Sequence, residues 1–119
     1  MSRNNASILA LADYRTRHRT LYFTRSELNQ LLGLYSRHVS RGVWRDYAID
    51  NRDGMALFSV FRHTQEAPIY SIIKTAAAGA RPAEFIVQSG RQRLRVSGSL
   101  AEALEFFKMR LSLVRAEIR

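Results

Sequence analysis

Hydrophobic and polar residues alternate most regularly over Gly42–His63, in the stretch GVWRDYAIDNRDGMALFSVFRH. Alternation with a period of two is typical of strands, and the Asp53-Gly54 pair is a strong signal for a hairpin turn. One predicted face carries Arg45, Tyr47, Ile49, Ala56, Phe58 and Val60, and the other carries Trp44, Asp46, Ala48, Asp50, Leu57, Ser59 and Phe61. Because both faces carry aromatic residues, we expect this hairpin to be central in its sheet and covered on both sides.

Two amphipathic helices flank the predicted strands. Thr24–Glu27 has the spacing of a capping box, apolar residues follow with helical periodicity, and Gly42 suits a left-handed stop. The first helix is therefore predicted over about Arg25–Arg41. A second capping box at Ser99–Glu102 predicts a helix that continues to the C-terminus. Its apolar positions are Leu100, Leu104, Phe107, Leu111, Val114 and Ile118.

The remaining apolar runs are short and separated by turn residues. They predict strands at Leu21–Phe23, Ile69–Lys74, Phe85–Gln88 and Arg91–Val96. Consecutive strands joined by short turns pair in antiparallel fashion, and the helices form a separate layer. We therefore expect an α+β fold, with an antiparallel sheet of four to five strands and two amphipathic helices in the order β-α-β-β-β-β-β-α.

The length of 119 residues corresponds to a single domain. We expect residues 1–19 to form a mobile basic tail and residues 20–119 to form one α+β domain. The apolar segment at residues 6–12 has some features of a signal peptide, but it is short and only one arginine precedes it. No apolar run is long enough to cross a bilayer, so we expect no membrane span.

The formal net charge of +9, from 19 basic and 10 acidic residues, favours an anionic partner such as nucleic acid. Arginines alternate along one predicted strand and would form a row with a spacing of about 7 Å, which could follow phosphates. The alternative interpretation is an edge strand that its charges protect from aggregation. The candidate anion contacts are Arg15, Arg17 and Arg19 in the tail, and Arg91, Arg93 and Arg95 in the strand.

The stretch ELNQLLGLYSRHVSRGVWRDYAID, followed by ALFSVFRHT and PIYSIIK, resembles a family of short proteobacterial proteins known only as a domain of unknown function. The matching part is Leu21–Lys74, with a looser match through Phe85–Val87 and the last helix. WRDYAID and FSVFR are its most specific pieces. The resemblance implies a bacterial, cytoplasmic protein, and it implies no catalytic or binding residue.

Several kinds of active site have no counterpart in this sequence. There is no cysteine, no phosphate-binding glycine motif, and no pair of histidines at metal-ligand spacing. We therefore expect a protein that is not an enzyme and that uses no cofactor and no metal. Asp46 is the acidic residue of most interest. It is either a carboxylate of a partly buried functional site or, as we favour, one half of a structural ion pair with an arginine such as Arg62 or Arg37.

The function that the sequence favours is a protein-interaction module, with a partner protein or a second copy as its target. The last helix carries a second apolar stripe, which would form a contact patch if it were exposed. The candidate contact residues are Trp44, Phe61, Phe106, Met109 and Leu113. The alternative is a nucleic-acid-binding protein that uses the basic tail and the arginine-lined strand.

Overall fold

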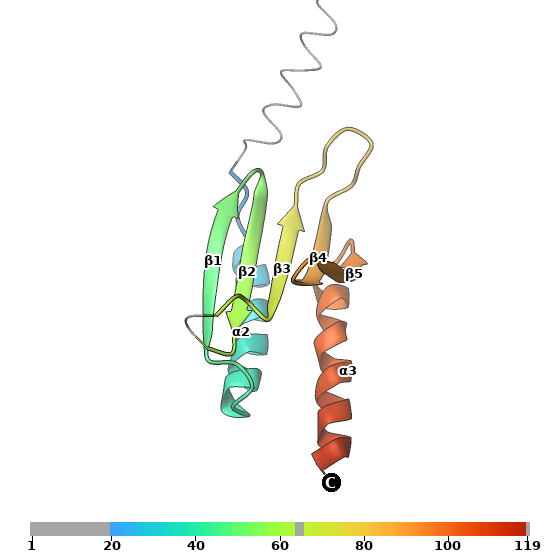
Figure 1. Ribbon diagram of the computed structural model, residues 1–119. Coiled ribbons are helices and arrows are strands. Elements are labelled where there is room, and N and C mark those ends of the chain that lie inside the picture. The colour runs from blue at the N-terminus through green and yellow to red at the C-terminus, as the bar shows by residue number, and fades with distance from the viewer. Residues whose placement is uncertain (1–19, 64–65, 119) are drawn as a thin grey trace, which may run out of the picture.

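The computed structural model describes residues 20–63 and 66–118, and side chains at 20–63, 66–108 and 110. It shows two helices and a five-stranded antiparallel sheet, which confirms the predicted α+β class (Figure 1). The predicted tail at residues 1–19 lies outside the described residues. The elements are α2 (Arg25–Ser40), β1 (Asp46–Arg52), β2 (Met55–Phe61), β3 (Tyr70–Thr75), β4 (Glu84–Ser89), β5 (Gln92–Ser97) and α3 (Leu100–Ile118).

The strand predicted at Leu21–Phe23 is wrong, because this segment joins no strand of the sheet. Instead, side chains of the sheet donate hydrogen bonds to the carbonyl oxygens of this segment. The Asn51 amide on β1 donates to the carbonyl of Leu21, and Lys74 Nζ on β3 donates to that of Tyr22 at 2.9 Å. The Phe23 side chain is buried in the core, so the segment leads directly into α2.

Both ends of α2 follow the local sequence signals. Thr24 Oγ1 accepts the Glu27 N–H at 3.2 Å, and a carboxylate oxygen of Glu27 accepts the Thr24 N–H at 2.7 Å, which completes the predicted capping box. Gly42 has a φ of +71° and follows the last turn. The predicted helix is therefore confirmed to within a residue at its C-terminal end.

The turn between β1 and β2 sets the register of the hairpin. Asp53 and Gly54 have φ values of 53° and 72°, and two positive values are typical of a type I′ turn. Arg52 therefore lies opposite Met55, and Tyr47 lies opposite Val60. This register groups the strand residues on two faces as the alternation predicted.

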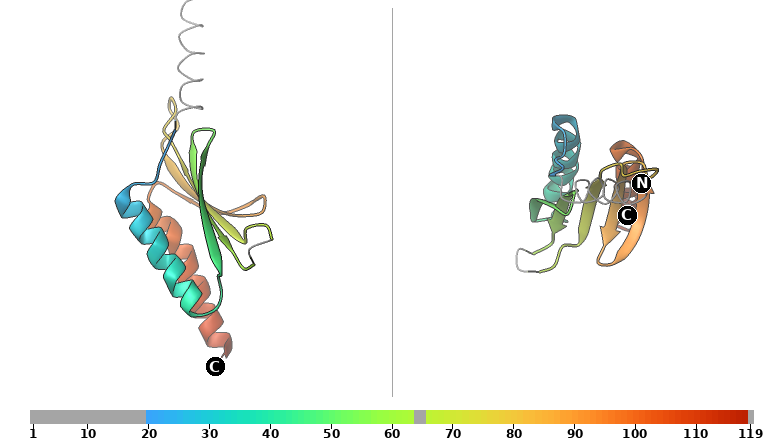
Figure 2. Two further views of the ribbon diagram at one scale, coloured as in Figure 1. Left: turned by 90° about the vertical axis from the view of Figure 1, so that its left-hand side faces the viewer. Right: turned by 90° about the horizontal axis from the view of Figure 1, so that it is seen from above.

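Both helices cover the same face of the sheet, and β1 is an edge strand (Figure 2). The prediction of a central hairpin covered on both sides is therefore wrong, since no described helix lies over the other face. On that face Leu57, Ile73 and Ile86 form a small cluster with Met55. These three residues bury one another to 6–8% exposure, which explains how the sheet tolerates the apolar positions that suggested a second layer.

The main core lies between the sheet and the two helices. It joins residues from α2, from the three inner strands and from the first two turns of α3 into one cluster. The fully buried large side chains are Leu31, Leu34, Trp44, Phe58, Val60, Ile72, Val87 and Phe107. Burial of a large apolar side chain contributes about 1.5–3 kcal/mol, so this cluster is the main source of stability.

Candidate functional site

Trp44 stacks on His38 where α2 ends and the chain turns back toward the sheet. The two ring centroids are 3.8 Å apart, with 12° between the ring planes. The backbone N–H groups of Val43 and Trp44 both point to the His38 carbonyl, at 2.9 and 3.5 Å. This turn carries Trp44 into the core, where it is 2% exposed. The prediction that Trp44 lies on an exposed contact face is wrong, because Trp44 precedes β1 and does not follow its alternation.

Aromatic residues from α3 and β3 close around Trp44. Phe107 meets the Trp44 ring edge-on at 5.5 Å and the Tyr70 ring at 5.1 Å. Phe106 also packs on Tyr70, at 5.9 Å. Phe106 is half-buried against the core, so it is not part of an open stripe as the sequence suggested. The predicted contacts Met109 and Leu113 lie outside the described side chains, and Phe61 is half-buried on the face away from the helices.

A pocket of about 170 Å³ opens beside this aromatic cluster. Two exposed arginines, Arg62 after β2 and Arg110 on α3, line it together with the apolar walls. The Arg110 guanidinium lies 5.4 Å from the centroid of the Phe106 ring, within cation–π distance. The apolar lining consists of Val43, Trp44, Ile69, Tyr70 and Phe107. The pocket therefore combines an apolar body with a positively charged rim.

His38 also lines this pocket, and its ring is neutral at pH 7. Nδ1 lies 2.9 Å from the Leu34 carbonyl oxygen, so Nδ1 is the nitrogen that carries the proton. Burial lowers the pKa of His38 below its ordinary value, and the positive charge of Arg37 lowers it further. The hydrogen bond to Leu34 acts in the opposite direction and is outweighed. The positive charge at the pocket therefore comes from arginine.

The edge strand β1 carries exposed apolar side chains among charged ones. Ile49 is 45% exposed and Tyr47 is 38% exposed, on the face that carries the helices. The carboxylates of Asp46 and Asp50 accept the backbone N–H of the residue that follows each of them, both at 2.8 Å. Among the described residues, no ion pair joins Asp46 to Arg37 or Arg62, and this favoured interpretation of Asp46 is wrong. The Asp46 carboxylate accepts the backbone N–H of Tyr47 instead.

Sequence reasoning missed an ion pair between α2 and β3. Lys74 Nζ lies 2.8 Å from Glu27 Oε1, and the two side chains are only 15% and 16% exposed. Burial alone would raise the pKa of Glu27, but the hydrogen bonds from Lys74 and Thr24 and the charge of Lys74 outweigh it and lower that pKa. No local signal could have revealed this pair, because 47 residues separate its members along the chain.

The predicted arginine row does not form. Arg91 lies in the turn before β5, and a bulge between Val87 and Gln88 shifts the register of β5. Arg93 therefore pairs with Gln88 and Arg95 pairs with Val87, which places the two arginines on opposite faces of the sheet. The prediction failed because strict alternation assumes a strand without a bulge. The tail residues Arg15, Arg17 and Arg19 lie outside the described residues.

The described part of the chain shows neither a membrane-spanning helix nor a metal-binding group. None of its helices combines the length and the apolar character that a membrane crossing requires. Nor does that part bring three metal-ligating side chains together into a group that could hold an ion.

The comparisons with known proteins identify a family without a known activity. No curated protein and no solved structure is significantly similar to the chain. A family model described as "Protein of unknown function (DUF2794)" matches residues 21–104. The match continues past Lys74, where the resemblance in sequence is looser, and it covers the whole sheet and the start of α3. The chain therefore belongs to the DUF2794 family of proteins of unknown function.

Proposed function

We propose that this chain is a protein-interaction module without enzymatic activity, and that its partner is a second copy of itself bound through β1. The observation that carries the proposal is the symmetry of charge about Ile49 in β1, Asp46–Arg52, which reads DYAIDNR. In an antiparallel pair of β1 strands centred on Ile49, residues at equal distances from Ile49 lie opposite each other. Such a pair is isologous, which is the commonest arrangement of homodimers.

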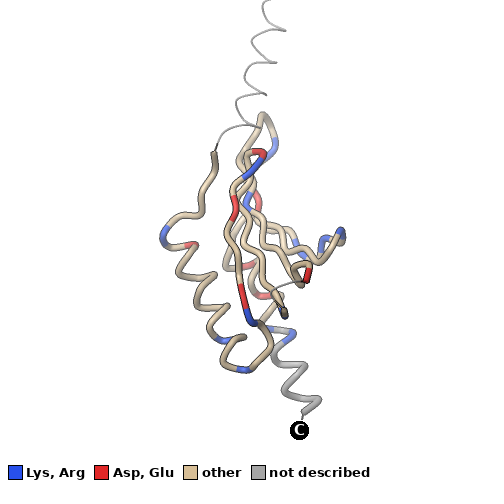
Figure 3. The backbone as a smooth tube through the Cα atoms, turned by 60° about the vertical axis from the view of Figure 1, so that its left-hand side comes forward, with Lys and Arg blue, Asp and Glu red and all other residues tan. Residues whose placement is uncertain are grey.

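This register matches charges of opposite sign at both ends of the strand. Asp46 lies opposite Arg52 of the second copy, and by symmetry Arg52 lies opposite Asp46 of that copy. Figure 3 shows the basic and acidic positions interspersed along this edge. Opposite charges across a strand pair contribute roughly 0.2–1 kcal/mol each, and the two-fold symmetry doubles the number of pairs. A shift of the register by one residue would remove this match.

The same register brings Ile49 against Ile49 of the second copy. Ile49 and Tyr47 are among the most exposed large apolar residues of the described chain, at 45% and 38%. Self-association would bury these side chains against each other. The resulting loss of apolar surface supplies the non-directional part of the binding free energy.

Association through the open edge also has a cost, because some outward N–H groups of β1 already have hydrogen-bond acceptors. Arg52 and Met55 flank a two-residue turn, so alternate residues of β1 direct their N–H groups outward. Asp46 and Asp50 cap two of these outward groups, on Tyr47 and Asn51. On pairing, the two N–H groups exchange carboxylate acceptors for carbonyl acceptors of the second copy. The released Asp46 carboxylate then becomes available to Arg52 of that copy.

The nucleic-acid alternative has less support than self-association. Arg93 and Arg95 point to opposite faces of the sheet, so β5 offers no continuous row of guanidinium groups. The net charge of +9 is the remaining argument, and charge alone produces non-specific attraction.

Charge reversal tests the proposal through the mass in solution. We expect the natural chain to be a dimer at micromolar concentration by light scattering after size-exclusion chromatography. The Asp46→Arg and Arg52→Glu variants place like charges opposite each other, and each should be monomeric under the same conditions. An equimolar mixture of the two variants restores opposite charges and should form a heterodimer.

The matched control is Arg93→Glu, which makes the same charge change on the opposite edge strand and should leave the dimer intact. A monomeric natural chain at this concentration overturns the proposal, and so does a mixture of the two β1 variants that fails to associate. Measured binding of DNA or RNA by such a monomer would favour the nucleic-acid alternative.

A further inference from the structure

We propose that the aromatic pocket at the end of α2 is a binding site for a small organic carboxylate with a single aromatic ring. The pocket is distinct from the β1 edge and does not depend on self-association. Its residues come from the end of α2, from β3 and the loop before it, and from α3. They are brought together by the turn that follows Gly42.

The walls select the body of the ligand. Phe107 meets the rings of Trp44 and Tyr70 edge to face at 5.5 and 5.1 Å, and the Trp44 and Tyr70 rings are tilted by 54°. Trp44 and Phe107 line the pocket but are almost fully buried, so the half-buried Tyr70 presents most of the accessible ring surface. A ring bound there would extend the aromatic cluster in the edge-to-face or offset geometry that aromatic groups prefer. The volume of about 170 Å³ is below the 300–1,000 Å³ typical of drug-sized ligands. The pocket therefore suits one substituted ring better than a nucleotide.

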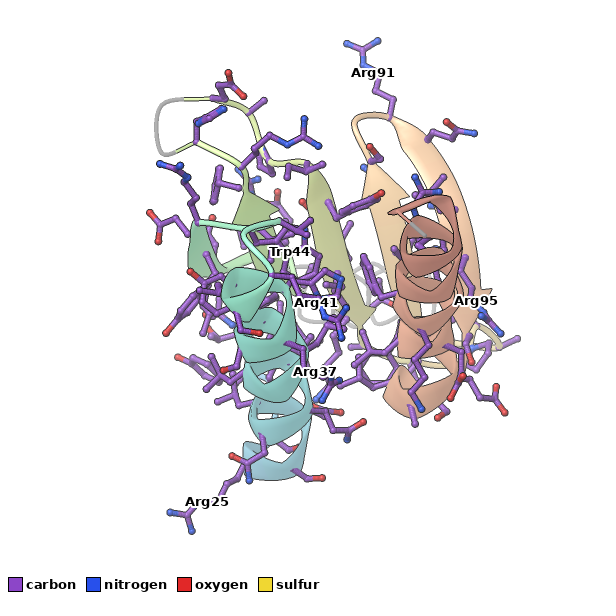
Figure 4. The ribbon with its side chains drawn as sticks, turned by 90° about the horizontal axis from the view of Figure 1, so that it is seen from below. Arg25, Arg37, Arg41, Trp44, Arg91 and Arg95 are labelled. Atoms are coloured by element: carbon purple, nitrogen blue, oxygen red, sulfur yellow. The ribbon has the colours of Figure 1, made fainter. Side chains whose placement is uncertain are left out.

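The rim selects the charge of the ligand. Arg62 and Arg110 line the pocket and are exposed, whereas no acidic side chain lines it. Arginine binds carboxylates through paired N–H groups, which gives the contact direction as well as energy. Arg37 and Arg41, in and just after the last turn of α2, add positive charge at this end of the molecule (Figure 4). A ligand with a ring at one end and a carboxylate at the other matches both the apolar walls and the charged rim of the pocket.

Because His38 is neutral, the walls of the pocket contact the ring of the ligand while the rim contacts its carboxylate. The Nδ1 atom of His38 is engaged by the Leu34 carbonyl and the imidazole ring is stacked on Trp44, so His38 forms part of the neutral wall. An imidazolium at this position would place positive charge inside the pocket. Because the histidine is neutral, the positive charge lies only at the rim, where a carboxylate remains partly hydrated.

The single tryptophan of the chain makes the test direct. Trp44 lines the pocket, so its fluorescence reports on occupancy without a label. Titration of the full chain with phenylacetate should change this fluorescence in a saturable way, with a Kd on the order of 1 mM. Phenylacetamide has the same ring without the charge and should bind at least about fivefold more weakly. Acetate has the charge without the ring and should produce no saturable change.

Substitutions at the rim locate the site. Arg62→Gln and Arg110→Gln should each weaken phenylacetate binding about threefold to fivefold, because each removes one exposed charged partner. Arg25→Gln and Arg91→Gln remove the same charge far from Trp44 (Figure 4) and should leave the Kd unchanged. The Arg52→Glu variant of β1 should also bind normally, which separates this site from self-association.

Three results would overturn the site. The first is the absence of a saturable change well above 1 mM phenylacetate. The second is equal affinity for phenylacetate and phenylacetamide, which would remove the role of the arginines. The third is an equal loss of affinity in the rim variants and in the Arg25→Gln and Arg91→Gln controls. This result would show that the net positive charge of the chain, and not the rim, attracts phenylacetate.

Discussion

At the scale of single residues, His38 makes the stability of the fold depend on pH. Its pKa is lowered in the folded chain by burial and by Arg37, while Arg62 and Arg110 also line the pocket that it faces. As the pH falls below the ordinary value of 6.5, the unfolded chain gains a proton at this position and the folded chain does not. The contribution of neutral His38 to the free energy of unfolding is therefore complete above pH 6.5. It is lost as the pH falls toward the pKa that His38 has in the folded chain.

We expect the free energy of unfolding to decrease between pH 7 and pH 5 in urea titrations. A His38→Phe variant, which keeps a flat ring against Trp44, should lose most of this dependence. Fluorescence of Trp44 followed over the same pH range provides a second readout, because the rings are stacked at 3.8 Å. An equal slope in the natural chain and the variant would show that another group causes the pH dependence.

Also at this scale, the Glu27–Lys74 pair joins the start of α2 to β3. Removal of one partner leaves the other charge largely buried, so Glu27→Gln and Lys74→Met should each cost about 2–3 kcal/mol. The double variant should cost less than the sum of the two single variants, by about 1–2 kcal/mol. The exposed pair of Lys108 and Glu105 is the control, and its removal should cost well under 1 kcal/mol. Additive costs for Glu27 and Lys74 would contradict the coupling.

The residues that could be predicted are those whose partners lie a few positions away. The capping box at Thr24–Glu27 and the stop at Gly42 depend on neighbouring backbone groups, and the structure confirms both. Trp44 was misplaced because its direction depends on the turn after α2 and not on the alternation of β1. The Glu27–Lys74 pair and the pocket could not be predicted, since each depends on elements that only the folded chain brings together.

At the scale of elements, the hairpin of β1 and β2 depends on the conformation of Gly54. Its φ of +72° is disfavoured for residues with a side chain, so Gly54→Ala should lower the free energy of unfolding by about 1–2 kcal/mol. Gly98 is the matched control, because it has no positive φ and a Cβ there would meet no atom within 4 Å. Gly98→Ala should therefore be close to neutral in the same denaturation experiment. Equal costs at the two positions would show that the turn conformation does not matter.

Strand edges, in contrast, could not be predicted from the alternation of the sequence. The pattern of the hairpin over Gly42–His63 has aromatic residues on both faces, yet β1 is an edge strand. The face without a helix buries its apolar residues in a small cluster of their own. The bulge in β5 likewise breaks an alternation that looks regular in the sequence. The Asp caps on β1 fit this position, because they occupy N–H groups that an inner strand would give to its neighbour.

At the scale of the whole molecule, one core cluster connects both helices with the sheet. Leu31 and Leu34 from α2 share this cluster with Phe107 from α3 and with the inner strands, so loss of either helix would expose the same apolar surface. We therefore expect a single cooperative transition in urea. Trp44 fluorescence reports the part of the cluster where His38 of α2 and Phe107 of α3 pack on the Trp44 ring. Far-ultraviolet circular dichroism reports the helices and the sheet. The two curves should coincide, whereas an earlier loss of the Trp44 signal would show that the end of the molecule with the pocket opens separately.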